Sequence, residues 1–182
     1  MKPLAIFILA WSLQLAQTIP DFSGTWITDP ARAVLLRRVD TTSNGWGNVL
    51  EGLRRNQPYT LRITQSSAAL DIEFPQGTNT FLKTDPYALE GGKTTNVRDS
   101  GEYWRKTVTE AKWDGTALTL RATRQVDWWK RARPDEVVHQ DTELGTVYVL
   151  KLEQGGAQLV VETTLTDEKG QAQYRMIFTK AS

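Results

Sequence analysis

Two arginines, Arg105 and Arg124, are the residues whose type and spacing best suit a binding site. They lie in two segments of alternating apolar and polar residues, which the turn signal Asp114-Gly115 separates. If those two residues form the turn, Arg105 lies directly opposite Arg124, on the face that carries Leu120. Two positive charges in such positions are unfavourable unless an anion lies between them. The sequence therefore predicts a site for an anionic head group at these arginines.

Other arrangements of this arginine pair stay open. Both residues lie toward strand ends, where their side chains can reach water, and an acidic residue on another strand could neutralise them. A turn one residue longer would point Arg124 outward, because successive side chains alternate between the two faces of a sheet.

Catalytic and metal-binding motifs are absent from the sequence. His139 is the single histidine, and its neighbours Val137, Val138 and Gln140 are typical of a strand. The chain contains no cysteine, which excludes disulfides, cysteine-bound metals and thiol catalysis. We therefore expect no catalytic residue, no metal and no cofactor, and we do not expect an enzyme.

Length and charge indicate the general class of protein. The 182 residues, of which 40% are hydrophobic, are enough for one domain with a substantial core. The formal net charge is +1 and the basic residues form only short local groups, so we expect no nucleic-acid partner. The outward faces of the predicted strands carry charge, which argues against insertion into a membrane.

The N-terminus is predicted to be a secretory signal. Lys2 precedes an apolar run at residues 4–13 that is too short to span a bilayer. We expect cleavage after Ala16, with Gln17 as the alternative last residue of the signal. Residues 1–16 would then be a signal peptide and residues 17–182 one domain of a secreted or periplasmic protein.

Most of this domain is predicted to form antiparallel strands. Thr, Val, Tyr, Trp and Leu are enriched in segments that short turn signals separate. Roughly ten such segments are enough to close an up-and-down β-barrel around a small-molecule cavity. The clearest segments are residues 101–113, 116–126, 146–152, 159–165 and 172–180.

The last three of these segments predict one consistent inner face. A turn at Gly155-Gly156 pairs Tyr148 with Thr163, and a turn at 167–170 then sets Tyr174 on the same face. Three neighbouring segments would rarely share one apolar face in this way if they were helical. These strands and the hairpin at 114–115 together predict a set of interior residues. They are Tyr103, Arg105, Leu118, Leu120, Arg124, Tyr148, Val161, Met176 and Phe178.

Three short stretches of this domain resemble the corresponding parts of the small secreted lipocalin-like proteins of bacteria, relatives of the fatty-acid-binding proteins within the calycins. The motif Gly24-x-Trp26 in DFSGTW, the hairpin KWDGTAL and the last strand YRMIFTK carry this resemblance. It implies that a basic residue of the last strand lies over Trp26. Lys180 is nearer the end of that strand, but Arg175 is the better match for stacking on an indole. We therefore predict that Gly24, Trp26 and Arg175 close the barrel.

A short helical insertion is expected after the first strand. Asp29-Pro30 is a helix-start signal, and the apolar residues at 31–39 recur with helical spacing. A second short helix is predicted at Asn48–Arg55. The resemblance implies a lid over the barrel mouth, and a fixed plug is the alternative.

The alternating pattern breaks between Val126 and Glu143. Trp128 and Trp129 lie there beside three basic residues at 130–133. The segment is predicted to be a loop that either forms an aromatic and basic rim at the cavity mouth or packs its indoles on the barrel wall.

These observations predict a lipocalin-like, monomeric binding protein for a small apolar or amphipathic molecule, with a carboxylate as one option. The resemblance implies that interior arginines hold such a carboxylate, and Tyr103 or Tyr148 could complete the site. The alternative is a filled barrel that acts as a structural or protein-interaction module. The predicted ligand-binding residues are Arg105, Arg124, Tyr103, Tyr148, Leu120, Met176 and Phe178.

Overall fold

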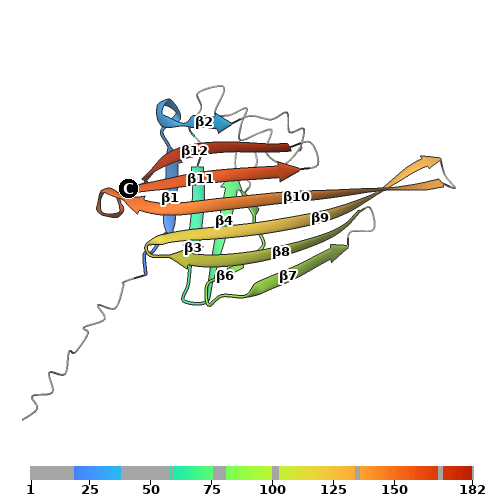
Figure 1. The fold of residues 1–182 in the computed structure, drawn as a ribbon, viewed down its shortest axis with the longest axis horizontal. Coiled ribbons are helices and arrows are strands. Elements are labelled where there is room, and N and C mark those ends of the chain that lie inside the picture. The colour runs from blue at the N-terminus through green and yellow to red at the C-terminus, as the bar shows by residue number, and fades with distance from the viewer. Residues whose placement is uncertain are drawn as a thin grey trace, which may run out of the picture.

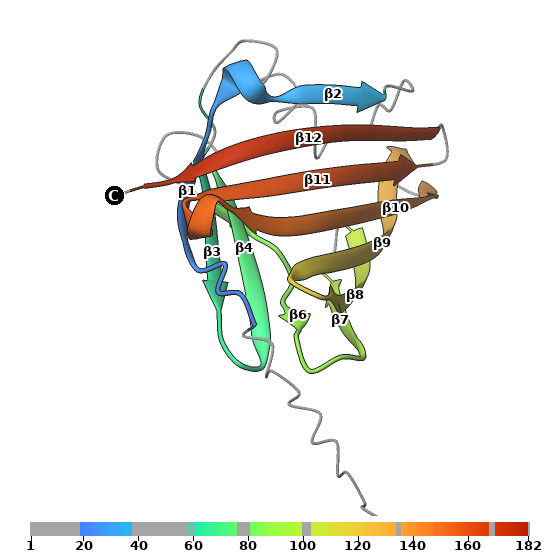
Figure 2. The same ribbon diagram turned by 60° about the vertical axis from the view of Figure 1, so that its left-hand side comes forward.

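Antiparallel strands of a single sheet curl into a nearly closed barrel in the computed structural model of the protein (Figures 1 and 2). The structure describes residues 19–37, 58, 60–75, 81–99, 103–133, 136–167 and 170–181. Of residues 30, 35, 37, 75, 81–82, 99, 103–104, 127–133 and 136–142, the backbone alone is described.

The described part of the chain contains twelve strands and two short 3-10 turns. The first half of the chain holds β1 (Gly24–Thr28), η1 (Pro30–Arg32), β2 (Val34–Arg37), β3 (Thr60–Gln65), β4 (Ala69–Pro75), β5 (Phe81–Lys83) and β6 (Tyr87–Ala88). The second half holds β7 (Lys93–Asp99), β8 (Tyr103–Asp114), β9 (Ala117–Arg133), β10 (Glu136–Glu153), η2 (Gln154–Gly156), β11 (Gln158–Asp167) and β12 (Gly170–Lys180).

The strand order confirms the predicted all-β, antiparallel barrel of roughly ten strands. Ten strands follow one another in the order β5-β4-β3-β1-β12-β11-β10-β9-β8-β7, and the first strand pairs with the last. β2 pairs with β12 and β6 pairs with β4, beside this path. The two strands at the ends of this path, β5 and β7, do not pair with each other among the described residues. One seam of the barrel is therefore not closed by strand hydrogen bonds. No helix in the described ranges is long and apolar enough to cross a membrane.

The hairpins at the C-terminal end have the predicted register. Tyr148 pairs with Thr163, and Thr163 pairs with Tyr174. Alternate residues of these strands enter one apolar core, because side chains two apart share a face of a strand. The largest fully buried members of that core are Trp26, Tyr87, Tyr174, Phe22, Phe178, Leu70, Ile72, Leu118, Leu120, Leu150 and Leu159.

The predicted register at the β8–β9 hairpin is wrong. The turn consists of Gly115 and Thr116, so Asp114 pairs with Ala117, one position later on each strand than expected. Gly115 has φ 60°, a left-handed conformation that glycine adopts without strain. The partner of each residue moves by two, and an even shift keeps every side chain on its predicted face.

The predicted helical insertion is wrong where the structure describes it. Pro30–Arg32 is a single 3-10 turn, and Val34–Arg37 is strand β2. β2 pairs with the half of β12 that β1 leaves free, which satisfies backbone groups that a helix would leave unpaired. The second predicted helix, at 48–55, lies outside the described residues.

The predicted loop between Val126 and Glu143 is also wrong. β9 and β10 continue as a two-stranded ribbon beyond the ends of their neighbours, as Figure 1 shows. β8 pairs with β9 only as far as Trp128, and β11 pairs with β10 only from Gly145 onward. Beyond these points the described pairing of the ribbon is between β9 and β10 alone, so backbone hydrogen bonds between two strands, and not an alternating pattern, define this segment.

One end of the barrel is closed around Trp26. Its indole N–H donates to the carbonyl of Phe22 at 2.9 Å, and the Phe22 ring stacks on Trp113 with centroids 6.0 Å apart. Gly24 has φ 141°, and a Cβ atom there would lie 2.8 Å from Cε of Lys180. Glycine therefore lets the stem of Lys180 pass close to β1.

Lys180, and not Arg175, lies over the Trp26 ring, with Nζ 5.4 Å from its centroid. Arg175 alternates out of the barrel, since Tyr174 and Met176 on either side are buried inside. Its guanidinium lies 3.8 Å from Glu153 on β10 and 3.9 Å from Glu162 on β11. The contact with Glu153 crosses β11, so Arg175 ties three strands together on the outer face.

Candidate ligand-binding site

The inner face of strands β7 to β12 changes from apolar to polar along the barrel. Residues that pair directly across these strands form rows, and each row lies one step further from the end that Trp26 closes. In that direction the rows are Trp113-Leu118-Leu150-Val161-Met176, Ala111-Leu120-Tyr148-Thr163-Tyr174, Thr94-Thr109-Ala122-Thr146-Leu165-Ala172, Asn96-Thr107-Arg124-Leu144 and Arg98-Arg105-Val126. The wall therefore offers hydrocarbon at one end and hydrogen-bonding groups at the other.

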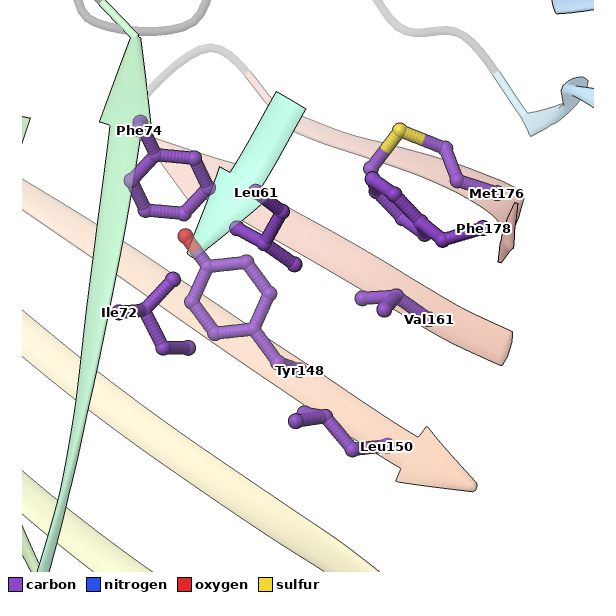
Figure 3. Close-up of a pocket in the computed structure, with 8 residues that line it drawn as sticks. All are labelled: Leu61, Ile72, Phe74, Tyr148, Leu150, Val161, Met176 and Phe178. Carbon is purple, nitrogen blue, oxygen red and sulfur yellow. The ribbon is translucent and has the colours of Figure 1, made fainter. Parts of the chain in front are cut away.

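Among the described residues, side chains from the facing walls pack together at the apolar end. Phe74 of β4 and Tyr148 of β10 meet from opposite walls, with ring centroids 6.3 Å apart (Figure 3). The pocket between the walls has a volume of about 10 Å³, which is at most the room for one water molecule. Its lining is Leu61, Ile72, Phe74, Tyr148, Leu150, Val161, Met176 and Phe178.

Three buried donors lie side by side in the fourth row, on Asn96 of β7, Thr107 of β8 and Arg124 of β9. We call these three residues the donor row. Nδ2 of Asn96, Oγ1 of Thr107 and Nε of Arg124 are buried, and none has a hydrogen-bond partner among the described residues. Thr107 as a whole is 2% exposed. Each of these atoms carries a proton that it can donate, so the row is suited to acceptor atoms of another molecule.

The buried carboxylate of Asp85 contacts arginines on the other side of the open seam. It lies between β5 and β6, and its Oδ1 accepts a hydrogen bond from Nη2 of Arg98 at 3.1 Å. Nη2 of Arg105 lies 3.9 Å from the other carboxylate oxygen. Next to it, the Thr109 hydroxyl donates to the carbonyl of Pro86 at 2.7 Å. These contacts hold residues 85–86 against β7 and β8, where strand pairing does not.

Tyr87 connects this seam to the donor row. Burial raises the pKa of its phenol far above the ordinary value, Arg124 acts to lower it, and Asp85 acts to raise it. Tyr87 is therefore a neutral phenol at physiological pH. This effect on its pKa is consistent with the charge of Arg124 lying near the phenol.

Arg105 and Arg124 both face the interior, as predicted, but the register does not set them opposite each other. Arg105 pairs with Val126, and Arg124 pairs with Thr107. Asp85 neutralises Arg105, which was one of the alternatives that the sequence left open. Among the described residues Arg124 has no carboxylate partner.

The other predicted ligand-binding residues lie elsewhere. Tyr103 belongs to β8 and pairs with Trp128, and the structure describes only its backbone. The remaining four are buried in the apolar core, where they contact one another and the facing wall. They are Leu120, Tyr148, Met176 and Phe178. Contact of these residues with a ligand stays a prediction.

Sequence reasoning missed Asn96, Thr107 and Asp85 as site residues. Alternation along β7 and β8 places Asn96 and Thr107 on the inner face, so polar residues at inward positions were a usable signal. Asp85 precedes a proline and is typical of a turn, and nothing in its local sequence indicates a buried carboxylate. The described residues contain no group of three or more His, Cys, Asp or Glu side chains that could hold a metal ion.

Comparison with known proteins gives one similar structure. No protein-family model matches the chain, and no curated protein matches its sequence. The ileal bile acid-binding protein of zebrafish, solved in complex with cholic acid, is similar over 88% of this chain and 98% of its own, with 14% sequence identity and a TM-score of 0.48.

Proposed function

We propose that the protein binds a small molecule that presents a negatively charged, oxygen-rich group to the donor row. The observation that carries this proposal is the alignment of Asn96, Thr107 and Arg124, whose three buried donor atoms lack partners within the described residues. A buried donor without a partner costs about 1–3 kcal/mol, so three in one row are a substantial cost to the free protein. A bound acceptor would remove that cost.

The charges around the donor row favour an anion over a neutral acceptor. Arg98, Arg105 and Arg124 lie in the two most polar rows of the inner wall, and Asp85 contacts the first two of them. The net charge of these described side chains is therefore positive, and Arg124 is the one of the three arginines that Asp85 does not contact. Hydrogen bonds from a charged donor to an anion are about twice as strong as neutral ones, and burial strengthens them.

The ligand would reach the donor row from the end opposite Trp26. At the Trp26 end, the side chain of Gln65 accepts from the backbone N–H of Phe22 and donates to the carbonyl of Pro20, both at 3.0 Å. The chain before β1 is thus fixed beneath the barrel, with Phe22 fully buried. The polar rows lie away from this closure.

A barrel without a ligand is the second candidate, and the tightly packed apolar end favours it. In that case the protein would act as a structural or interaction module. Secretion after removal of residues 1–16, a monomeric state and the lack of any reaction also remain part of the proposal, on the sequence alone.

Calorimetric titration with hexanoate tests the proposed function. We expect Arg124→Met to weaken binding by about tenfold or more and Thr107→Val by about fivefold, since each removes a hydrogen bond to a charged group. Arg121→Met is the matched control, because Arg121 lies on the same strand but is exposed on the outer face. Equal affinities for all variants, or no binding of hexanoate or of phosphate, would contradict the proposal and favour the filled barrel.

A further inference from the structure

We infer that the ligand is compact, an oxyanion with a short hydrocarbon part, and is neither a long-chain nor a fused-ring lipid. This inference rests on the proposed function and adds the size and class of the ligand. It depends on the packing of side chains between the donor row and the Trp26 end of the barrel. This packing is a separate observation from the unpaired donors.

The first step concerns the room at the apolar end. Ligand sites for drug-sized molecules enclose about 300–1,000 Å³. The pocket where Phe74 meets Tyr148 encloses about 10 Å³, and Phe22 stacked on Trp113 closes the end beneath it. A hydrocarbon tail that pointed from the donor row toward this end would have to displace packed core side chains.

The second step concerns the wall between the donor row and that pocket. Thr109 lies on it, and Thr163 lies directly opposite Tyr148 at the edge of the pocket; they are 1% and 2% exposed. The Thr109 hydroxyl is bonded to Pro86, whereas Oγ1 of Thr163 is buried without a partner among the described residues. A long alkyl chain over Thr163 would leave this hydroxyl unsatisfied, as it is in the free protein, whereas an acceptor atom of the ligand would satisfy it and strengthen binding. The wall thus favours further oxygen atoms over methylene groups.

The third step is the expected dependence of affinity on ligand size. Each methylene group that leaves water for an apolar wall strengthens binding by about fourfold. If the apolar end has no room, methylene groups beyond the first few stay in water or disturb the core. Affinity should then level off early in a series of carboxylates of increasing length.

A chain-length series on the full chain tests the inference. Butyrate, hexanoate, octanoate and decanoate would be titrated beside the matching alkyl phosphates, and the two arms distinguish a carboxylate from a phosphate as the oxyanion. We expect no more than about a twofold gain from butyrate to decanoate in either arm. A gain of about fourfold for each methylene would overturn the inference and leave the proposed function standing.

Two further results separate the inference from the proposed function. If no member of either series binds, or if Arg124→Met changes nothing, the proposed function fails as well. Tyr148→Ala enlarges the filled end by removing one of the two facing rings. In this variant affinity should rise with the chain length of the ligand. An affinity that stays independent of chain length would show that the packed apolar end does not limit ligand size. The wild-type series decides the question alone if this variant does not fold.

Discussion

Lys180 lies directly opposite Trp26 in the pairing of β12 with β1, and its ammonium nitrogen is 5.4 Å from the centre of the indole ring. The indole is fully buried, so one face of a core residue interacts with a charged group at the barrel rim. Lys180 lies on the same side of β12 as the buried Met176 and Phe178, which precede it by four and two residues. The closing interaction follows from that alternation.

Lys180→Met should remove this cation–π contact and keep the hydrocarbon stem. We expect a loss of about 0.5–1 kcal/mol in the free energy of unfolding, measured by urea denaturation, together with a changed chemical shift of the Trp26 indole N–H. Arg175→Met is the control, because Arg175 contacts Glu153 and Glu162 on the outer face. An indole signal that responds to Arg175→Met and not to Lys180→Met would contradict the assignment.

Asp85→Asn should destabilise the protein by about 2–4 kcal/mol. The substitution removes the buried carboxylate charge that lies beside the partly buried Arg105, and breaking a buried ion pair is costly, although Arg98 is 60% exposed and can turn to water. Asp71→Asn is the matched control, since Asp71 pairs with the exposed Lys83 on the outside and should cost at most about 1 kcal/mol. Equal losses for the two variants, in thermal and urea unfolding, would argue against Asp85 as the contact that holds the seam.

Thr109→Val should destabilise the free protein, whereas Thr107→Val should not. Both residues are buried on the inner side of β8, but only the Thr109 hydroxyl has a described acceptor. Losing that bond should cost about 1–2 kcal/mol, whereas replacing the unpaired hydroxyl of Thr107 should be neutral or stabilising. If Thr107→Val were as destabilising as Thr109→Val in calorimetry, Thr107 would have a structural partner and the donor row would lose its central member.

The pH dependence of stability should reveal Tyr87. Its pKa is raised in the folded protein above the ordinary value of 10.0, so the neutral phenol is the form that folding favours. The resulting stabilisation is fully present below about pH 10 and is lost as the pH rises toward the folded-state pKa. Relative to Tyr87→Phe, the wild type should lose up to about 1.4 kcal/mol per pH unit above pH 10. Parallel stability curves for the two proteins would show that Tyr87 ionises freely.

Alternation and turn chemistry were sufficient to predict much of the barrel. The Gly155-Gly156 turn sets Tyr148 opposite Thr163, as expected, because the glycine pair marks the turn clearly and the inner side of both strands is the more apolar one. At Asp114-Gly115 both residues are good turn formers, so the sequence could not decide which pair occupies the turn. β2 could not be predicted from residues 34–37, because their strand conformation depends on the free edge of β12.

The candidate site was predictable only in part. Alternation correctly places Arg124 inside the barrel, and the same rule applied to β12 would have placed Arg175 outside and Lys180 inside. The donor row needs the pairing of Asn96 with Thr107, which joins strands across a turn of uncertain length. Asp85 reaches Arg105 across a seam between strands that do not pair, and no local pattern encodes such a contact.

Side-chain NMR of the donor row tests the central claim most directly. In the 15N-labelled protein, the Nδ2 amide of Asn96 and the Nε–H of Arg124 can be followed while butyrate is added, with the Nε–H of the exposed Arg121 as internal control. The account predicts that the Asn96 and Arg124 signals shift together along one binding curve, while the Arg121 signal stays in place. Donor-row signals that do not move, or that move no more than Arg121, would contradict it.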